Sequence, residues 1–214
     1  MTAFASVVLD VDSTVSALEG IDWLAEQRDA EVAATVAALT ADAMESRVPI
    51  DEVYDRRLSI IRPTRRELSA LADAYIAAAM PDVRDAVMMW RAAGVRVVLV
   101  SGGLRDALLP LAAWLGVAVS DVHAVEVEYT NDVVTGVRNG SPLARHGGKP
   151  TVVESLGLAR AILALGDGAT DAELAPFVDR FMAFTGVVRR ETVVAASAGE
   201  VHSFAALTPI VLGR

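Results

Sequence analysis

The chain has 214 residues, of which 53% are hydrophobic and 22% are charged, a balance that supports a packed core and argues against intrinsic disorder. Its formal net charge of -9 argues against a nucleic-acid partner, because binding to a phosphate backbone needs a basic surface. The sequence contains no cysteine, which excludes disulfides, thiolate metal sites and thiol nucleophiles.

The same composition bears on location and size. No apolar run is long enough to span a bilayer, so we expect no membrane association. The first residues, MTAFASVV, carry no basic leader of the secretory kind, and together with the lack of cysteine this predicts a cytoplasmic protein. The length suits one domain, or a core with an insertion. The oligomeric state is left open between a monomer and a homodimer.

The first expected element is a short buried strand at residues 7–9, with the sequence Val-Val-Leu. It ends at two carboxylates, Asp10 and Asp12, which are followed by Ser13 and Thr14. In an open α/β sheet, ligands bind at the carboxyl ends of the strands. Taken alone, this Asp-x-Asp-Ser-Thr string is equally consistent with a turn or a helix N-cap on a solvated loop.

Residues 18–80 have helical spacing and predict three or four short helices without a strand. A block of this length is too long for a plain crossover between two strands of a sheet. We interpret it as a small helical cap over the strand ends. The predicted division is therefore an α/β core made of residues 1–16 and 80–214, and a cap made of residues 17–79.

An α/β rhythm follows the insertion. The expected elements are a helix at 82–93, a buried strand at 95–100, a helix at 104–115, a β-hairpin formed by 122–129 and 133–137, a helix ending at 156, a buried strand at 160–165, a strand at 180–184 and a helical tail. The pattern predicts a Rossmann-like parallel sheet flanked by helices.

Residues that carry chemistry follow these strands or begin these helices. They are Asp10 and Asp12, the Ser101-Gly102-Gly103 triplet, Lys149, Asp167 and Asp171. Each one alone is weak evidence, since a lysine is most often solvated and a Ser-Gly-Gly triplet is most often a turn. Together, on successive α/β units, they indicate a site for phosphoryl transfer.

The acids suit the chemistry of that transfer. Carboxylates of Asp10 and Asp167 suit Mg²⁺, a hard cation that prefers oxygen ligands, and Asp12 is a further candidate ligand. Asp10 can act as the nucleophile that forms an aspartyl-phosphate. Asp12 can protonate the leaving oxygen and later deprotonate the attacking water.

The remaining residues suit the phosphate. The hydroxyl of Ser101 and the N–H groups of Gly102 and Gly103, which we expect to open a helix, can hold its oxygens. Lys149 can neutralise charge on Asp10 and the phosphate. Asp171 is expected to anchor Lys149 or a metal-bound water.

The order DVDST, SGG, GGK and GDGATD resembles the four motifs of the haloacid dehalogenase superfamily, and the insertion after the first motif resembles its small helical cap. Over nearly its whole length the chain resembles the phosphoserine phosphatase family within that superfamily. The resemblance implies a hydrolase for phosphoric monoesters that uses Mg²⁺ to convert O-phospho-L-serine to L-serine and phosphate, in serine biosynthesis. The expected partner is thus a small phosphorylated amino acid.

The same resemblance implies roles in the cap and nearby. Glu19 would bind the substrate ammonium and Arg57 its carboxylate, which a planar guanidinium matches in a bidentate fashion. Met44 and Ile50 would line the cap side of the pocket. Thr170 is assigned to substrate binding and Arg190 to a supporting role.

Two departures from the family pattern concern substrate choice. Ile50 stands where the family usually has a phenylalanine, and Glu45 and Ser46 replace its usual glycines. Because both lie in the cap, they loosen the assignment of the substrate and leave the phosphatase interpretation unchanged. Ile50 leaves room for some tolerance of phosphothreonine.

Other functions remain alternatives. A phosphotransferase, or a phosphatase for phosphothreonine, homoserine phosphate or histidinol phosphate, would need the same core motifs. A non-enzymatic receiver domain also uses an acidic pocket with a lysine, but the insertion and the Asp-x-Asp spacing argue against it. A dehalogenase is disfavoured because its chemistry does not need Asp12.

Overall fold

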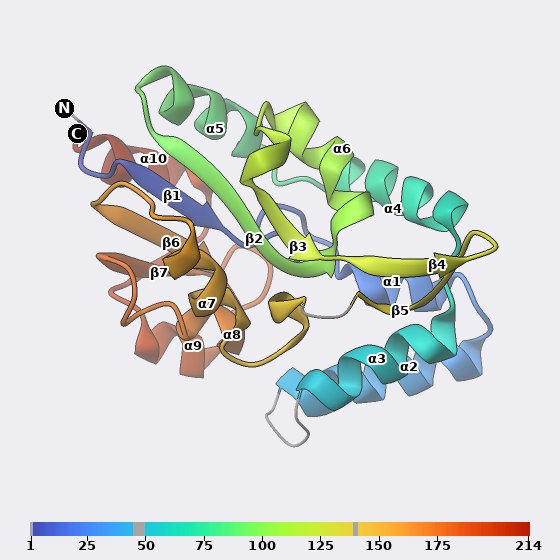
Figure 1. Cartoon of the computed structure of the whole chain (residues 1–214). Helices are drawn as coiled ribbons and strands as arrows, with labels where there is room; N and C mark the ends of the chain where they lie inside the picture. The colour runs from blue at the N-terminus through green and yellow to red at the C-terminus, as the bar shows by residue number, and fades with distance from the viewer. Residues whose placement is uncertain (1, 45–49, 139–140) are drawn as a thin grey trace.

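The computed structural model describes the backbone of residues 2–44, 50–138 and 141–214, and the side chains of these residues except those from 41 to 52. At its centre is a six-stranded sheet in which all strands run parallel (Figure 1). In spatial order the strands are β3 (Val122–Val125), β2 (Arg96–Leu104), β1 (Ser6–Leu9), β6 (Ile162–Gly166), β7 (Arg180–Phe184) and β8 (Glu200–Val201). The three apolar runs predicted as buried strands thus lie side by side in the middle.

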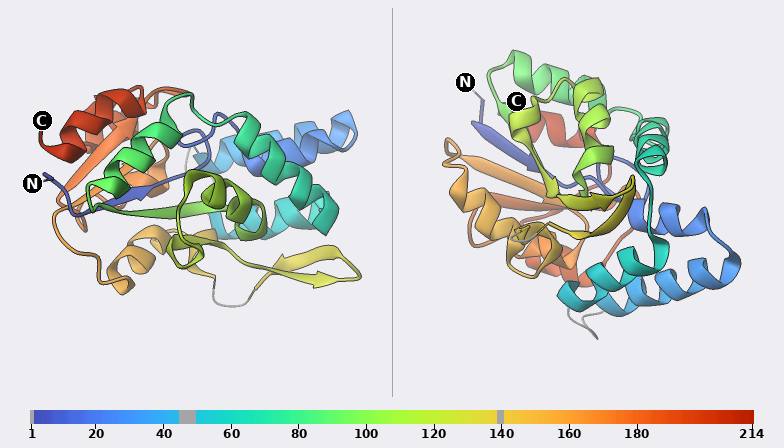
Figure 2. Two further views of the ribbon diagram at one scale, coloured as in Figure 1. Left: turned by 90° about the horizontal axis from the view of Figure 1, so that it is seen from above. Right: turned by 45° about the vertical axis from the view of Figure 1, so that its right-hand side comes forward.

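Helices cover both faces of this sheet (Figures 1 and 2). On one side lie α5 (Val83–Ala92), α6 (Arg105–Leu115) and α10 (Phe204–Leu212). On the other side lie α7 (Gly148–Ser155), α8 (Ala169–Ala172) and α9 (Glu191–Ala196). Short 3-10 helices, η1 (Val119–Asp121) and η2 (Pro142–Ala144), complete the connections. This arrangement confirms the predicted Rossmann-like fold.

The core is continuous between the sheet and its helices. Every residue of β1 is buried, as expected for a central strand of a parallel sheet. The rings of Trp90 and Phe184 contact that of Phe204, with centroids 6.1 and 5.4 Å apart, and attach α10 to the core. Among the helices of the described part of the chain, none has both the length and the apolar character needed to cross a membrane.

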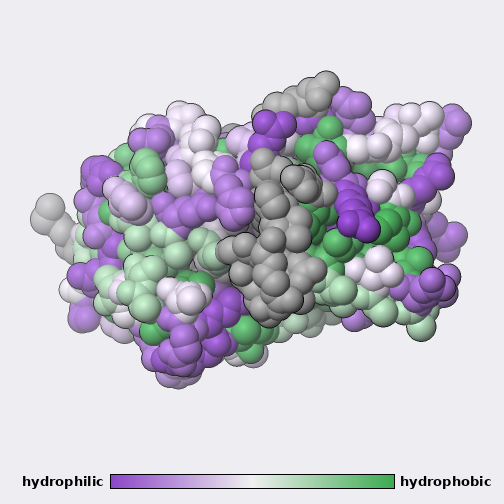
Figure 3. All heavy atoms as spheres, turned by 90° about the horizontal axis from the view of Figure 1, so that it is seen from below, coloured by the Kyte–Doolittle hydropathy of each residue, from purple (hydrophilic) through white to green (hydrophobic). Residues whose placement is uncertain are grey.

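The insertion after β1 consists of α1 (Gly20–Glu26), α2 (Ala30–Met44), α3 (Ile50–Ile61) and α4 (Arg65–Ala77), all in the region predicted to be helical. These helices lie beyond the carboxyl ends of the central strands (Figure 1). Helix α4 packs along α6, and its residues Leu71 and Tyr75 belong to the common core. The division into a core and a separate cap stays a prediction. Seen from below, hydrophobic residues gather in the right-hand part of the surface, in the region of α2 and α3 (Figure 3).

The prediction of one hairpin arm at 122–129 is wrong. This segment forms two strands that belong to different sheets. Strand β3 joins the parallel sheet beside β2, whereas β4 (Val127–Thr130) pairs antiparallel with β5 (Val133–Val137). The apolar alternation runs through both strands, so the sequence shows no break at Glu126. The turn between β4 and β5 has positive φ at Asn131 and Asp132, as a tight hairpin turn requires.

Candidate active site

The register of three adjacent strands brings the motifs together. Leu9, the last residue of β1, lies opposite Leu99 of β2 and Leu165 of β6. Asp10 therefore follows β1 at the level where β6 ends, and its N–H donates to the carbonyl of Leu165 at 3.0 Å. Asp167 comes directly after β6, and Ser101 lies in β2. The structure thus brings Asp10, Ser101 and Asp167 together at the carboxyl ends of these strands.

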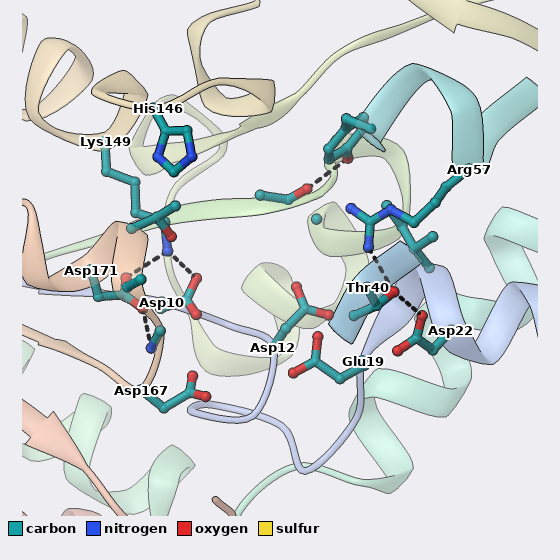
Figure 4. A pocket seen from close by; sticks show the side chains of 17 residues that line it. Asp10, Asp12, Glu19, Asp22, Thr40, Arg57, His146, Lys149, Asp167 and Asp171 are labelled. Atoms are coloured by element: carbon teal, nitrogen blue, oxygen red, sulfur yellow. Dashed lines mark hydrogen bonds and ion pairs between the residues drawn. The ribbon is translucent and has the colours of Figure 1, made fainter. Parts of the chain in front are cut away.

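Lys149 lies between two of the acids. Its Nζ is 2.8 Å from Oδ1 of Asp10 and 2.5 Å from Oδ1 of Asp171, and all three side chains are buried (Figure 4). Burial works to lower the pKa of Lys149, but the two carboxylates outweigh it and hold the pKa above its ordinary value. The lysine is therefore a fixed positive charge beside Asp10.

Asp171 is held against the backbone at the end of β6. A Cβ at Gly166 would lie 2.1 Å from Cγ of Asp171, so only glycine fits there. Oδ2 of Asp171 accepts from the N–H of Gly168 at 2.9 Å. This close approach leaves the other carboxylate oxygen for Lys149.

Three buried carboxylates, those of Asp10, Asp167 and Asp171, have oxygen atoms within 4.8 Å of one another. Burial and the charge of Asp171 raise the pKa of Asp10, and the same two causes raise the pKa of Asp167 to about 6. Clustered acids of this kind are stabilised by a cation, and an all-oxygen donor set suits a hard divalent metal ion. The group therefore fits a divalent metal site.

Two further contacts hold Asp167. Its carboxylate accepts from the hydroxyl of Thr14 at 3.0 Å and forms an ion pair with Arg190. Arg190, at the start of α9, thus lies beside a candidate metal ligand, where a supporting residue was expected.

Asp12 is separate from this acidic group. Its Oδ1 accepts from the N–H of Gly20 and the hydroxyl of Tyr75, each at 2.7 Å, and its Oδ2 accepts from Ser101 at 3.3 Å. Burial raises the pKa of Asp12, although these hydrogen bonds favour the charged form. Its side chain is therefore oriented toward β2 and the insertion, and Asp12 can hold and release a proton.

The prediction that Gly102 and Gly103 open a helix is wrong. Strand β2 continues to Leu104 and α6 begins at Arg105. The N–H of Gly103 donates to Oγ of Ser101 at 2.9 Å, and a Cβ at Gly103 would lie 3.0 Å from Oδ2 of Asp12. The triplet is thus an extended strand end that needs a small residue beside Asp12.

These residues border a cavity of about 100 Å³ (Figure 4). From the core, its lining includes Asp10, Asp12, Gly102, Gly103, Lys149, Asp167, Thr170 and Asp171. From the insertion, its lining includes Glu19, Asp22, Thr40, Tyr54 and Arg57. The cavity therefore joins the acidic group to the helices expected to select the substrate.

The insertion contributes Arg57 and two acids, Glu19 and Asp22, to the lining of this cavity. Arg57 is only 8% exposed, donates from Nη1 to the hydroxyl of Thr40 at 3.1 Å, and has a buried Nε without a hydrogen-bond partner in the described structure. Glu19 accepts from the hydroxyl of Ser13 at 2.6 Å, and burial together with the charge of Asp12 raises its pKa to about 8. An unsatisfied guanidinium donor in a cavity suits an anionic ligand.

Two residues that line the cavity, Asp22 and Tyr54, are not among those predicted from the sequence. Asp22 accepts from Thr40 at 2.7 Å, and Tyr54 lies over Arg57. Tyr54 and Arg57 are three residues apart on one face of α3, whereas Glu19 directly precedes α1, in which Asp22 lies. This short spacing is the only signal that the sequence offers for Asp22 and Tyr54. The side chains of Met44 and Ile50 fall outside the described residues.

Most of this sequence is similar to known proteins. A family model described as haloacid dehalogenase-like hydrolase matches residues 7–176. Phosphoserine phosphatase of Mus musculus is 35% identical over 192 residues, which cover 88% of this chain and 84% of that protein. The chloroplastic phosphoserine phosphatase of Arabidopsis thaliana is 34% identical over 208 residues, which cover 94% of this chain and 70% of that protein.

Solved structures show the same fold. A phosphoserine phosphohydrolase-like protein from Francisella tularensis superposes with a TM-score of 0.87 at 20% identity, covering 96% of this chain and 99% of that one. A phospho-aspartyl intermediate analogue of phosphoserine phosphatase superposes with a TM-score of 0.81 at 19% identity, covering 95% of this chain and 96% of that one. Helices like those after β1 are therefore part of a known architecture.

Proposed function

Since this chain belongs to the haloacid dehalogenase-like hydrolase family and, within it, to the phosphoserine phosphatases, we propose that it hydrolyses O-phospho-L-serine to L-serine and inorganic phosphate. In this proposal it uses Mg²⁺, acts in L-serine biosynthesis and is located in the cytoplasm. The lack of cysteine in the sequence supports that location.

One observation carries the choice of substrate. Glu19 and Arg57 line the same cavity as Asp10, so an acid and a cation face the space next to the nucleophile. A phosphorylated amino acid offers an ammonium, a carboxylate and a phosphate on one small molecule. Arg57, with its unpartnered Nε, suits the carboxylate. Glu19 suits the ammonium, whose positive charge favours the ionised carboxylate and opposes the burial that raises the pKa of Glu19.

In the first half-reaction, the carboxylate of Asp10 attacks phosphorus, and the bond between phosphorus and the serine oxygen breaks. Asp12 donates its proton to that leaving oxygen, a role that its raised pKa supports. The products are L-serine and a phosphorylated Asp10. Lys149, 2.8 Å from Asp10, and the hydroxyl of Ser101 stabilise the charge that spreads over the phosphate oxygens.

In the second half-reaction, water attacks the phosphorus of phosphorylated Asp10. Asp12, now ionised, takes a proton from that water, the acyl-phosphate bond breaks, and the carboxylate of Asp10 is restored. Inorganic phosphate leaves, and Asp12 has regained the proton that it lost. Gly20 and Tyr75 hold the side chain of Asp12 in one orientation for both proton transfers.

The proposal assigns the Mg²⁺ site to Asp10 and Asp167, with Asp171 close to both. When bound, the ion supplies positive charge to the phosphate oxygens and relieves the repulsion among the carboxylates. Asp12 was also a candidate ligand, but its carboxylate lies among hydrogen-bond donors outside this group.

The direct test is release of inorganic phosphate from a panel of monoesters, with and without Mg²⁺. The panel contains phosphoserine, phosphothreonine, phosphoethanolamine, homoserine phosphate and histidinol phosphate. We expect phosphoserine to have the highest kcat/KM and Mg²⁺ to be required. Asp10→Asn is expected to have no turnover, whereas Asp73→Asn, a change at an exposed residue of α4, keeps it. Another preferred substrate, or turnover by Asp10→Asn, would contradict the proposal.

A further inference from the structure

Tyr54 connects the two halves of the cavity, and no step described above depends on it. The side chain is 2% exposed, lies on α3 and lines the cavity. Its hydroxyl donates to the carbonyl of Gly102 at 2.6 Å. This hydrogen bond joins a helix of the insertion to the end of β2, beside Ser101.

The ring of Tyr54 also contacts Arg57. The two residues are three apart on α3 and lie on the same face of that helix. The guanidinium carbon lies 5.4 Å from the ring centroid, within the range of a cation–π interaction. Thr40 is the other described contact that holds the guanidinium. One tyrosine therefore touches both the arginine and the backbone next to the phosphate-binding serine.

We propose that Tyr54 is a positioning residue that sets the distance between Arg57 and the phosphate-binding end of β2. The inference rests on the proposed function, in which one substrate reaches both places with its carboxylate and its phosphate. Because those groups are a fixed number of bonds apart, a site already held at the matching separation binds the substrate at lower entropic cost. Burial raises the pKa of Tyr54, so its hydroxyl remains a donor across the working pH range.

The variant Tyr54→Phe removes only the hydroxyl and keeps the ring over Arg57. We expect kcat/KM for phosphoserine to fall about tenfold, mainly through KM, because the carbonyl of Gly102 loses its partner and the two binding places are no longer coupled. Phosphoethanolamine, which lacks the carboxylate, should change less than about twofold. Tyr54→Leu, which also removes the ring, should lose about a hundredfold on phosphoserine alone.

Tyr129→Phe is the matched control. Tyr129 also donates its hydroxyl to another element, at Asp106 of α6, but lies outside the cavity, so both substrates should be unaffected. Equal losses of Tyr54→Phe on both substrates, or no loss on phosphoserine, would overturn the proposal. A wild-type enzyme without a preference for phosphoserine refutes the proposed function together with this inference. A wild-type preference that Tyr54→Phe retains refutes the role of Tyr54 alone.

Discussion

The hydroxyl of Tyr75 donates a hydrogen bond of 2.7 Å to Oδ1 of Asp12. Tyr75 belongs to α4 of the insertion, and the N–H of Gly20, at the start of α1, donates to the same oxygen. A Cβ at Gly20 would lie 2.0 Å from the hydroxyl oxygen of Tyr75. The insertion therefore orients the acid through a contact that has room for glycine only.

Gly20→Ala tests this contact. The added methyl group must displace Tyr75, so Oδ1 of Asp12 loses one of its two donors and Asp12 loses its fixed orientation. We expect kcat for phosphoserine to fall by about 10- to 100-fold, since small misplacements of a catalytic group have effects of that order. Gly136→Ala, at a position with open space around it, is the control and should keep full activity. Full activity in Gly20→Ala would show that the orientation of Asp12 is unimportant.

Asp12→Asn tests the acid–base role. We expect turnover of phosphoserine to slow by about 10²–10⁴-fold, the usual contribution of general acid–base catalysis. A nitrophenyl phosphate, whose leaving group needs no proton, should retain much of the first step, so phosphoenzyme can accumulate. Rapid-quench experiments measure how much phosphoenzyme accumulates. Equal losses for both substrates would assign Asp12 a structural role instead.

Arg57→Ala tests recognition of the carboxylate. Loss of the buried guanidinium leaves the substrate carboxylate without a partner, at a cost of about 2–5 kcal/mol. We expect kcat/KM for phosphoserine to fall roughly 30-fold to several-thousand-fold, with little change for phosphoethanolamine. Arg56→Ala is the control, because Arg56 is the exposed neighbour on the same helix. An equal loss on both substrates would contradict the assigned role.

Mg²⁺ should stabilise the fold through the acidic group of Asp10, Asp167 and Asp171. At a concentration about 100 times Kd, binding contributes about 2.7 kcal/mol, which for a chain of this size raises Tm by about 5–10 °C. Asp167→Asn should abolish most of this shift. The measurement is thermal unfolding with and without Mg²⁺, with Asp73→Asn as the control. A shift that Asp167→Asn retains would place the metal elsewhere.

Glu67 predicts a pH-dependent stability. Glu67 accepts hydrogen bonds from Arg28 and from Thr64, the N-cap residue of α4. These hydrogen bonds hold the pKa of Glu67 at about 2. Because this pKa is below the unfolded value, the stabilisation is present above pH ~4.5 and is lost as pH falls toward 2. Glu67→Gln should therefore lower stability by about 1 kcal/mol at pH 7 and much less near pH 3.

Urea unfolding over this pH range measures the difference in free energy of unfolding. Glu154→Gln, at an exposed position of α7, is the control and should show no such trend. A difference between Glu67→Gln and the wild type that stays constant with pH would mean that the charge of Glu67 is not what stabilises α4.

Much of the core could be predicted because buried parallel strands have a local signature. Residues 7–9 and 160–165 read as apolar runs, and the acids that follow them mark the strand ends. The sequence predicts that this strand ends at Val100, whereas β2 continues to Leu104. Ser101-Gly102-Gly103 reads as a turn by composition, yet it extends the strand, and pairing with β3 resumes at Leu104 and Val125.

The missed site residues depend on tertiary contacts. Tyr75 lies 63 positions from Asp12 in the chain, and Thr40 lies 17 from Arg57, so no local pattern announces either pair. In the sequence alone Thr40 and Tyr75 look like ordinary residues of amphipathic helices. Their roles follow from how α1, α2, α3 and α4 pack over the strand ends, which local propensity does not specify.

Strand β1 lies between β2 and β6, so the proposed nucleophile, phosphate-binding serine and metal ligand lie in or directly after neighbouring strands about 4.8 Å apart. That spacing comes from backbone hydrogen bonding, and it is the same whatever side chains the sheet carries. The reacting groups can thus be inherited unchanged while α1 and α3 diverge around them. Exchanging those helices is a route by which evolution, or a protein engineer, can obtain a phosphatase for a different monoester from the same sheet.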